Sequence, residues 1–209
     1  RPRSIPRSVT SFGKLLKAEI AESGPMFTVL ELHYAVDGAL EYTARFKLYR
    51  DLPHIALNIR LAKTLVKDPE GMYAAFPLAV PGGVWHLDKA GAAIRPGVDQ
   101  LPGTCTDYYM VQAGAALLGG ECGAAVTVLD APMVHVGELR LWTYGASIEP
   151  EGTLYSWLTN NKWETNFKAA CEGHYEFRYL IDLLPGRADA AAAQDVYERR
   201  QFPPLAVRL

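Results

Sequence analysis

The feature that most constrains the fold is a series of four segments near the start of the chain in which apolar and polar side chains alternate. A period of two places successive side chains on opposite faces of a β-strand, and a half-solvated antiparallel sheet produces this alternation. Short turns separate the segments at Gly24-Pro25, at Asp37-Gly38 and at residues 50–53. The predicted strands cover residues 14–22, 26–35, 40–49 and 55–65, and together they form a meander.

The rest of the chain is also strand-like until its last part. Further strands are expected over residues 72–80, 84–88, 113–118, 123–130, 154–159 and 174–183, with a short strand over residues 130–135 that is entered through a turn. One helix is expected, from Ala188 to Arg200, because an alanine run ends in a basic turn that Pro203-Pro204 terminates. The sequence therefore predicts an all-β protein, a large two-sheet antiparallel β-sandwich with one short C-terminal helix. A barrel is the alternative.

The length of 209 residues suits a single large β-sandwich domain. We expect this domain to cover residues 13–209, because residues 1–12 carry two prolines and three arginines with little to bury. That first segment is interpreted as a linker or as a strand borrowed by a missing neighbour. Since the chain does not begin with Met, we expect it to be a piece of a longer protein.

Charge and cysteine content narrow the class of protein. The net charge is −2 and the basic residues are scattered, which argues against nucleic acid or an anionic membrane as partner. No apolar stretch is long enough to suggest a membrane span. Cys105, Cys122 and Cys171 show no metal-binding or redox spacing, which favours a reducing compartment or buried free thiols. A cytoplasmic location is expected.

A long segment rich in glycine and proline, residues 89–107, is expected to be a loop. Loops of this length inside a compact domain are usually functional. Its candidate ligand-binding side chains are Arg95, Asp99, Gln100 and Asp107, and Tyr108 follows directly.

The second candidate region is the run Leu154 to Phe167, a strand that ends in an amide-rich turn flanked by Trp157 and Trp163. Amide groups beside aromatic rings are suited to facing a sugar, which singles out Asn160, Asn161 and Trp163. The alternative is a turn whose amides bond to their own chain, with both tryptophans in the core.

No catalytic or metal-binding motif is evident. Asp99 and Asp107 share a loop and form a weak candidate for a pair of glycosidase carboxyl groups. The histidines lack zinc-site spacing, and Cys105 has no activating base nearby in the sequence. The residues alone thus indicate a binding or supporting β-domain.

Several short segments, in this order, resemble the C-terminal β-sandwich region of family-38-type glycoside hydrolases, the α-mannosidase-like enzymes. They are Leu48-Tyr-Arg-Asp-Leu-Pro-His54, Gly71-Met-Tyr-Ala-Ala-Phe-Pro-Leu78, Arg95-Pro-Gly-Val-Asp-Gln100, Asp107-Tyr-Tyr-Met-Val-Gln112, Ala124-Ala-Val-Thr-Val-Leu-Asp-Ala-Pro132, and the run from Leu154 to Phe167 followed by Phe177-Arg-Tyr179. No single segment matches closely enough to transfer a site residue by position.

The resemblance implies a galactose-mutarotase-like supersandwich with no catalytic residues of its own. Zinc, the nucleophile and the acid/base would belong to an N-terminal catalytic barrel, so no cofactor is expected in this chain. The implied partners are that barrel and a carbohydrate, and the eight side chains named above are the candidates for reaching the sugar.

Two other functions remain open at this point. A stand-alone aldose-1-epimerase would use His86 or His135 as acid and a carboxylate such as Glu164 as base. A free-standing carbohydrate-binding module would use the tryptophan turn alone.

Overall fold

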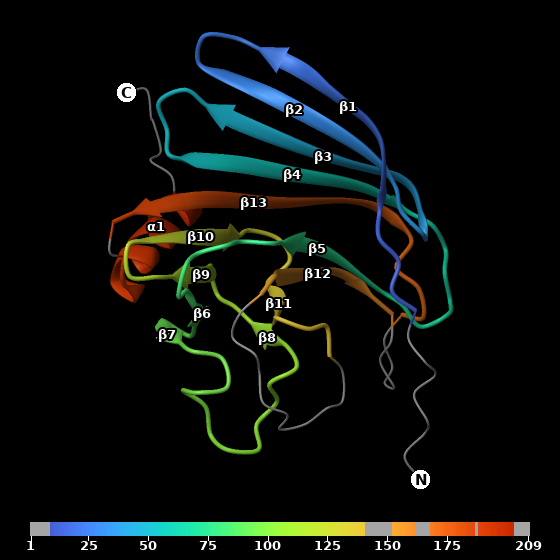
Figure 1. Ribbon diagram of the computed structural model, residues 1–209. Coiled ribbons are helices and arrows are strands. Elements are labelled where there is room, and N and C mark those ends of the chain that lie inside the picture. Colours follow the sequence, from blue (N-terminus) through green and yellow to red (C-terminus); the bar gives the residue numbers. More distant parts are fainter. Residues whose placement is uncertain (1–8, 141–151, 162–167, 187, 203–209) are drawn as a thin grey trace, which may run out of the picture.

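Two antiparallel sheets packed face to face make up the described part of the protein, which comprises residues 9–140, 152–161, 168–186 and 188–202 of the computed structural model. The larger sheet has nine strands in the order β1-β2-β3-β4-β13-β10-β9-β6-β7. The smaller has four, in the order β5-β12-β11-β8. Figure 1 shows the large sheet curving over the small one, with the β1–β4 end reaching beyond it. The predicted all-β sandwich is confirmed.

The strands of the large sheet are β1 (Lys14–Ser23), β2 (Phe27–Ala35), β3 (Ala39–Tyr49), β4 (His54–Lys63), β6 (Val84–Lys89), β7 (Ala92–Ile94), β9 (Gly114–Leu118), β10 (Cys122–Val128) and β13 (Gly173–Pro185). Those of the small sheet are β5 (Gly71–Phe76), β8 (Tyr109–Met110), β11 (Met133–Val136) and β12 (Leu154–Asn160). The first four strands pair in sequence order as the alternation predicts. The whole length of β4 then pairs with β13.

The core lies between the two sheets. Its fully buried side chains include Trp85 and Leu87 from the large sheet and Val134 and Leu154 from the small one. Burying an aliphatic or aromatic side chain of this size contributes about 1.5–3 kcal/mol. Because successive side chains alternate, Trp85 and Leu87 face the core while His86 points to the opposite face of the sheet.

The single described helix, α1 (Ala190–Gln201), packs on that opposite face, against β9 and β10. The side chain of Asp189 caps its first turn by accepting a hydrogen bond from the Ala192 amide at 2.9 Å. The guanidinium of Arg200 in its last turn pairs with Asp182 of β13. Gly114 lets the helix approach closely, since a Cβ there would lie 2.3 Å from the Val126 carbonyl and 2.7 Å from the Tyr197 ring. None of the described residues forms a helix long and apolar enough to span a bilayer.

The segment predicted to be an irregular loop, residues 89–107, is partly ordered into a hairpin. Strand β7 pairs with β6 through a tight turn in which Ala90 and Gly91 have φ angles of 54° and 78°. The sequence prediction is wrong over this short strand because its residues, all small or apolar, carry no alternation. The irregular part begins at Arg95. The predicted linker or borrowed strand falls mostly outside the described residues.

Candidate functional site

An ion pair between Arg95 and Asp99 closes the first part of the long loop. The Arg95 guanidinium donates hydrogen bonds to both carboxylate oxygens, at 3.0 and 2.8 Å, and its backbone amide adds a third at 2.9 Å. These bonds lower the pKa of Asp99 to about 2. A carboxyl group that stays ionised at neutral pH is a poor proton donor, so Asp99 does not suit the acid role of a glycosidase pair.

Gln100 attaches the same loop to the small sheet. Its side-chain oxygen accepts hydrogen bonds from the Gly97 amide at 2.7 Å and from the Tyr109 hydroxyl at 2.9 Å. Its amide nitrogen donates to the Cys105 carbonyl at 3.3 Å. Tyr109 lies in the core, where burial raises its pKa to about 12. The loop is therefore fastened to a rigid element.

The end of the loop brings Asp107 and Tyr108 to the outer face of the small sheet. Asp107 is buried, whereas Tyr108 is half-buried. The Tyr108 ring centroid lies 6.0 Å from the rings of both His135 on β11 and Trp157 on β12. The two regions singled out from the sequence, the long loop and the tryptophan strand, thus meet here.

Five rings gather on this outer face, and we call them the aromatic cluster: Tyr73, Tyr108, His135, Tyr155 and Trp157. Trp157 stacks on Tyr73, with centroids 5.3 Å apart and an angle of 23° between the planes. His135 lies 5.1 Å from Trp157 and 5.3 Å from Tyr73. The four rings on β5, β11 and β12 each alternate with a core residue of their strand, which places them on the face away from the large sheet, and Tyr108 contacts them there.

Glycine makes room for this stack at Gly71, the first residue of β5. A Cβ at that position would lie 2.7 Å from the indole nitrogen of Trp157 and 2.9 Å from the Tyr73 hydroxyl. Real Cβ atoms do not come so close, so any larger residue would displace the two rings.

His135 is the titratable group at the centre of the aromatic cluster. Its side chain is fully buried, and neither ring nitrogen has a hydrogen-bond partner of normal geometry among the described residues. Burial lowers the pKa of His135 to about 4, although the backbone and the carboxylate of Asp107 oppose that shift. The imidazole is therefore neutral at physiological pH, and it can donate or accept one hydrogen bond without carrying charge.

The amide turn is divided between described and undescribed residues. Asn161 accepts a hydrogen bond from the Glu70 amide at 2.7 Å and donates to the carbonyls of Val66 and Asp68 at 2.9 and 3.0 Å. Its side chain thus anchors the connection between β4 and β5. The carbonyl of Asn160 accepts a hydrogen bond from the Cys171 thiol at 3.3 Å. Trp163 and Glu164 lie outside the described residues.

The structure therefore brings only some of the eight predicted site residues to the aromatic cluster. Tyr108 joins the aromatic cluster directly, and Asp107 lies beside its histidine; Arg95, Asp99 and Gln100 shape the loop that delivers them. Sequence analysis missed Tyr73, because its place beside Trp157 depends on the pairing of β5 with β12, which are far apart in the chain. The sequence suggests His135 as an acid but gives no sign of the rings that surround it in the structure.

Two open cavities, of about 390 and 420 Å³, share no lining residue with the aromatic cluster. The first lies beside α1, and the second lies along residues 78–83. The aromatic cluster is thus separate from both of these cavities.

The class of protein that this architecture defines is a large antiparallel β-sandwich with a curved nine-stranded sheet and a smaller facing sheet. Comparison with solved structures identifies proteins that contain the same fold. An α-mannosidase from Enterococcus faecalis V583 superposes with a TM-score of 0.65 and 14% identity over 90% of this chain. A protein of glycosyl hydrolase family 38 from Enterococcus faecalis superposes with a TM-score of 0.64 and 13% identity, also over 90% of the chain.

The match covers only 24% and 25% of the length of those two proteins. No family profile matches this sequence, and no curated protein sequence matches it. At this identity the likeness concerns the fold, and at that level the resemblance to α-mannosidase-like glycoside hydrolases predicted from the sequence is confirmed.

Proposed function

We propose that this chain is a non-catalytic β-sandwich domain of an α-mannosidase-like glycoside hydrolase, which docks on a catalytic barrel and helps to form its carbohydrate site. The observation that carries the proposal is the structural match, which spans nine-tenths of this chain but about a quarter of each enzyme. On this proposal the zinc ion and the catalytic carboxyl groups belong to the barrel.

The acids of the long loop support a non-catalytic role. Asp99 is held by Arg95, and Asp107 is buried. A glycosidase needs one carboxyl group that is protonated and one that is free beside the bond to be cut. Asp99, which Arg95 keeps ionised, lacks the properties of the protonated partner.

The aromatic cluster supports a role beside a sugar. Tyr108 is half-buried at the end of the loop, next to a histidine that is neutral. Aromatic faces pack against the apolar faces of sugar rings, and uncharged polar groups bond their hydroxyls. We infer that Asp107 and Tyr108 are the residues of this chain nearest to the carbohydrate.

The exposed inner face of β1 supports docking. Leu15 is 49% and Ile20 is 59% exposed, yet both lie on the face that elsewhere packs on the core, as their partners Tyr34 and Leu30 show. Apolar side chains on an uncovered extension of a core face indicate an interaction surface. We propose that the catalytic barrel of the same enzyme covers them.

The test begins with the reading frame upstream of Arg1, which we expect to encode the barrel. The barrel and this chain are produced separately and mixed, and hydrolysis of an aryl α-mannoside is measured. We expect this chain alone to be inactive and the mixture to be active. Turnover by the isolated chain at enzyme-like rates would overturn the non-catalytic role, and an upstream frame without a catalytic domain would overturn the whole proposal.

A matched pair of variants tests the docking surface. Leu15→Glu with Ile20→Glu places charge on the proposed contact and should weaken association with the barrel at least tenfold in analytical ultracentrifugation. Leu183→Glu is the control, because Leu183 on β13 is equally exposed, at 64%. Equal affinity for both variants would show that β1 is not the docking face.

The aldose-1-epimerase alternative receives less support from the geometry. His86 lies on the helix side of the large sheet and His135 on the outer face of the small sheet, so they belong to different sites. A histidine whose pKa is about 4 has no proton to donate as imidazolium at pH 7. Polarimetry with glucose or galactose distinguishes this function, since an epimerase accelerates anomer exchange.

A further inference from the structure

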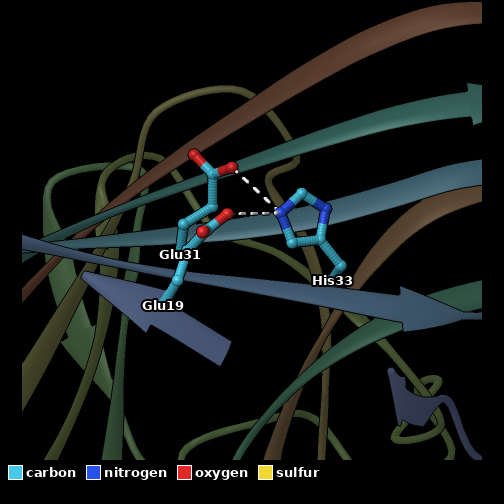
Figure 2. A group of neighbouring side chains, drawn as sticks. All are labelled: Glu19, Glu31 and His33. Carbon is cyan, nitrogen blue, oxygen red and sulfur yellow. Dashed lines mark ion pairs between the residues drawn. The ribbon is translucent and has the colours of Figure 1, made fainter. Parts of the chain in front are cut away.

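A cluster of three metal-ligating side chains lies on β1 and β2, away from the aromatic cluster and on the sheet face opposite to Leu15 and Ile20. Glu19 is on β1, and Glu31 and His33 are on β2. Leu32 and Tyr34 of β2 face the core, so Glu31 and His33 face outward from the sandwich. Glu19 pairs with Glu31 across the two strands and lies on the same outer face. Figure 2 shows both carboxylates directed at one nitrogen of the His33 ring.

The spacing of the three groups matches that of ligands around one metal ion. The Nε2 atom of His33 lies 3.0 Å from a Glu31 carboxylate oxygen and 3.6 Å from one of Glu19. All three ligand atoms lie within 4.8 Å of one another. Two ligands bonded to zinc at about 2.1 Å and about 90–110° apart are separated by about 3.0–3.4 Å. Only a small movement of Glu19 would complete the geometry.

His33 is oriented as a metal ligand would be. Its Nδ1 atom lies 3.3 Å from the hydroxyl of Thr43, on the neighbouring strand β3. Its Nε2 atom is shielded from solvent and makes no hydrogen bond of normal geometry, despite the nearby carboxylates. If Nδ1–H donates to Thr43, the Nε2 lone pair faces two negative groups, an unfavourable arrangement that a cation reverses. A second partner on the far ring nitrogen is the usual support of a metal-bound histidine.

Two basic residues already contact the carboxylates, and they do so in different ways. The Nε atom of Arg45 lies 2.9 Å from the other oxygen of Glu31, and this ion pair holds that carboxylate and leaves its first oxygen available. Lys17 contacts the same oxygen of Glu19 that faces His33, at 2.7 Å, but its side chain is 60% exposed. Arg45 therefore supports the ligand set, whereas Lys17 competes with a cation for Glu19.

We propose that Glu19, Glu31 and His33 bind one divalent transition-metal ion, of the zinc or manganese class, with water completing the coordination. An imidazole with two carboxylates suits these ions better than Mg²⁺ or Ca²⁺, which prefer oxygen ligands. The ion would link β1 to β2. Because β1 is the edge strand and nearly all of its residues are exposed, it has few other contacts to hold it. Its ligands lie on the face of β1 opposite to the proposed docking residues Leu15 and Ile20, and its test needs only this chain.

The test is calorimetric titration of the whole chain, freed of metal by a chelator, with Zn²⁺ and Mn²⁺ and with Mg²⁺ and Ca²⁺ as comparison ions. We expect one saturable Zn²⁺ or Mn²⁺ site and at least tenfold weaker binding of Mg²⁺ and Ca²⁺. His33→Ala should weaken the binding of the preferred ion at least tenfold. Lys17→Gln should strengthen it several-fold, because the competing charge is gone. His86→Ala, on β6 near the opposite edge of the same sheet, should leave it unchanged.

Hydrogen exchange provides a second readout. The backbone amides of β1 between Lys17 and Glu22 should exchange more slowly when the metal is bound, and this protection should be absent in Glu19→Gln. That variant changes one partly exposed side chain of an edge strand and keeps its size, so we expect it to fold. Absence of saturable binding of either transition-metal ion, or binding that His33→Ala and Glu19→Gln leave unchanged, would overturn the proposal.

Discussion

His135 and His33 occupy comparable positions, each on the outward face of one of the two sheets, but their surroundings are opposite. His135 is fully buried among Tyr73, Tyr108 and Trp157, and burial lowers its pKa to about 4. His33 is partly exposed and lies between two carboxylates. A histidine is therefore kept neutral by burial in the small sheet, whereas in the large sheet a histidine lies where, on our proposal, it binds a cation.

The difference follows from how much of each sheet is covered. The small sheet carries large rings on adjacent strands, and these rings bury one another on its outer face. The outer face of β1 to β3 carries charged side chains, and the inner face there extends past the small sheet. Packing therefore governs the outer face of the small sheet, and electrostatics governs the outer face of β1 to β3. The experiments below test this difference, beginning with the largest expected effect.

The largest effect is expected from Trp157→Ala. The indole is buried and stacked on Tyr73, so its removal leaves a cavity, and we expect a loss of about 3–5 kcal/mol in the free energy of unfolding. Urea denaturation measures this loss, with Trp157→Phe as a partial replacement that should retain part of the stability. A loss below about 1 kcal/mol would mean that the aromatic cluster is not tightly packed.

Asn161→Ala should cost about 2–3 kcal/mol, because it leaves the Glu70 amide and the carbonyls of Val66 and Asp68 without their partner. The comparison is Asn58→Ala, which removes one side-chain contact to Glu176 on the exposed side of the large sheet. We expect the Asn58 change to cost several-fold less in the same urea assay. Similar losses would show that Asn161 is not the anchor of this connection.

The third prediction concerns acid sensitivity. The pKa of His135 is lowered from 6.5 to about 4 on folding. Its contribution to stability is therefore complete above pH 6.5 and is lost as the pH falls toward 4, because only the unfolded chain takes up the proton. Between pH 7 and pH 5 this linkage amounts to about 2 kcal/mol.

His135→Phe tests that linkage. Between pH 7 and pH 5 both proteins should lose stability, but the loss in free energy of unfolding should be about 2 kcal/mol smaller for the variant than for the original chain. Tyr73→Phe is the control, since it changes the same cluster without removing a group that titrates in this range. An identical pH dependence in His135→Phe would mean that the imidazole takes up a proton equally well in the folded state.

The smallest effect is expected from Ile20→Ser in the isolated chain. Ile20 is 59% exposed, so the change should alter the free energy of unfolding by no more than about 0.5 kcal/mol. Ile59→Ser, on the same face but 2% exposed, should cost several times as much. A large loss at Ile20 would show that the edge of the large sheet is already covered within this chain.

Local sequence pattern was sufficient for the meander of β1 to β4 and for helix α1. Alternation specified which side chains face inward, and the turns at Gly24-Pro25 and Asp37-Gly38 specified where the chain reverses. The same pattern could not reveal β7, which is too short and uniform, nor the end of β5 at Phe76, where a longer strand was expected.

The candidate site was only partly predictable for the same reason. Tyr108 was chosen because it follows a long loop, and it does contact Trp157. Whether the polar residues of that loop and of the amide turn contact a sugar stays a prediction, although Gln100 and Asn161 already bond within the chain. Tyr73 and His135 could not be placed beside Trp157, because the three strands that carry them are distant in sequence.

The sequence by itself determined that this protein is an antiparallel all-β sandwich, because alternation and turn chemistry depend on residues that are close in the chain. Only the tertiary structure decided which residues meet: Trp157 with Tyr73, and Glu19 with His33. Strand pairing brings together residues far apart in the sequence, and it is set by how the whole apolar face is buried rather than by any local pattern.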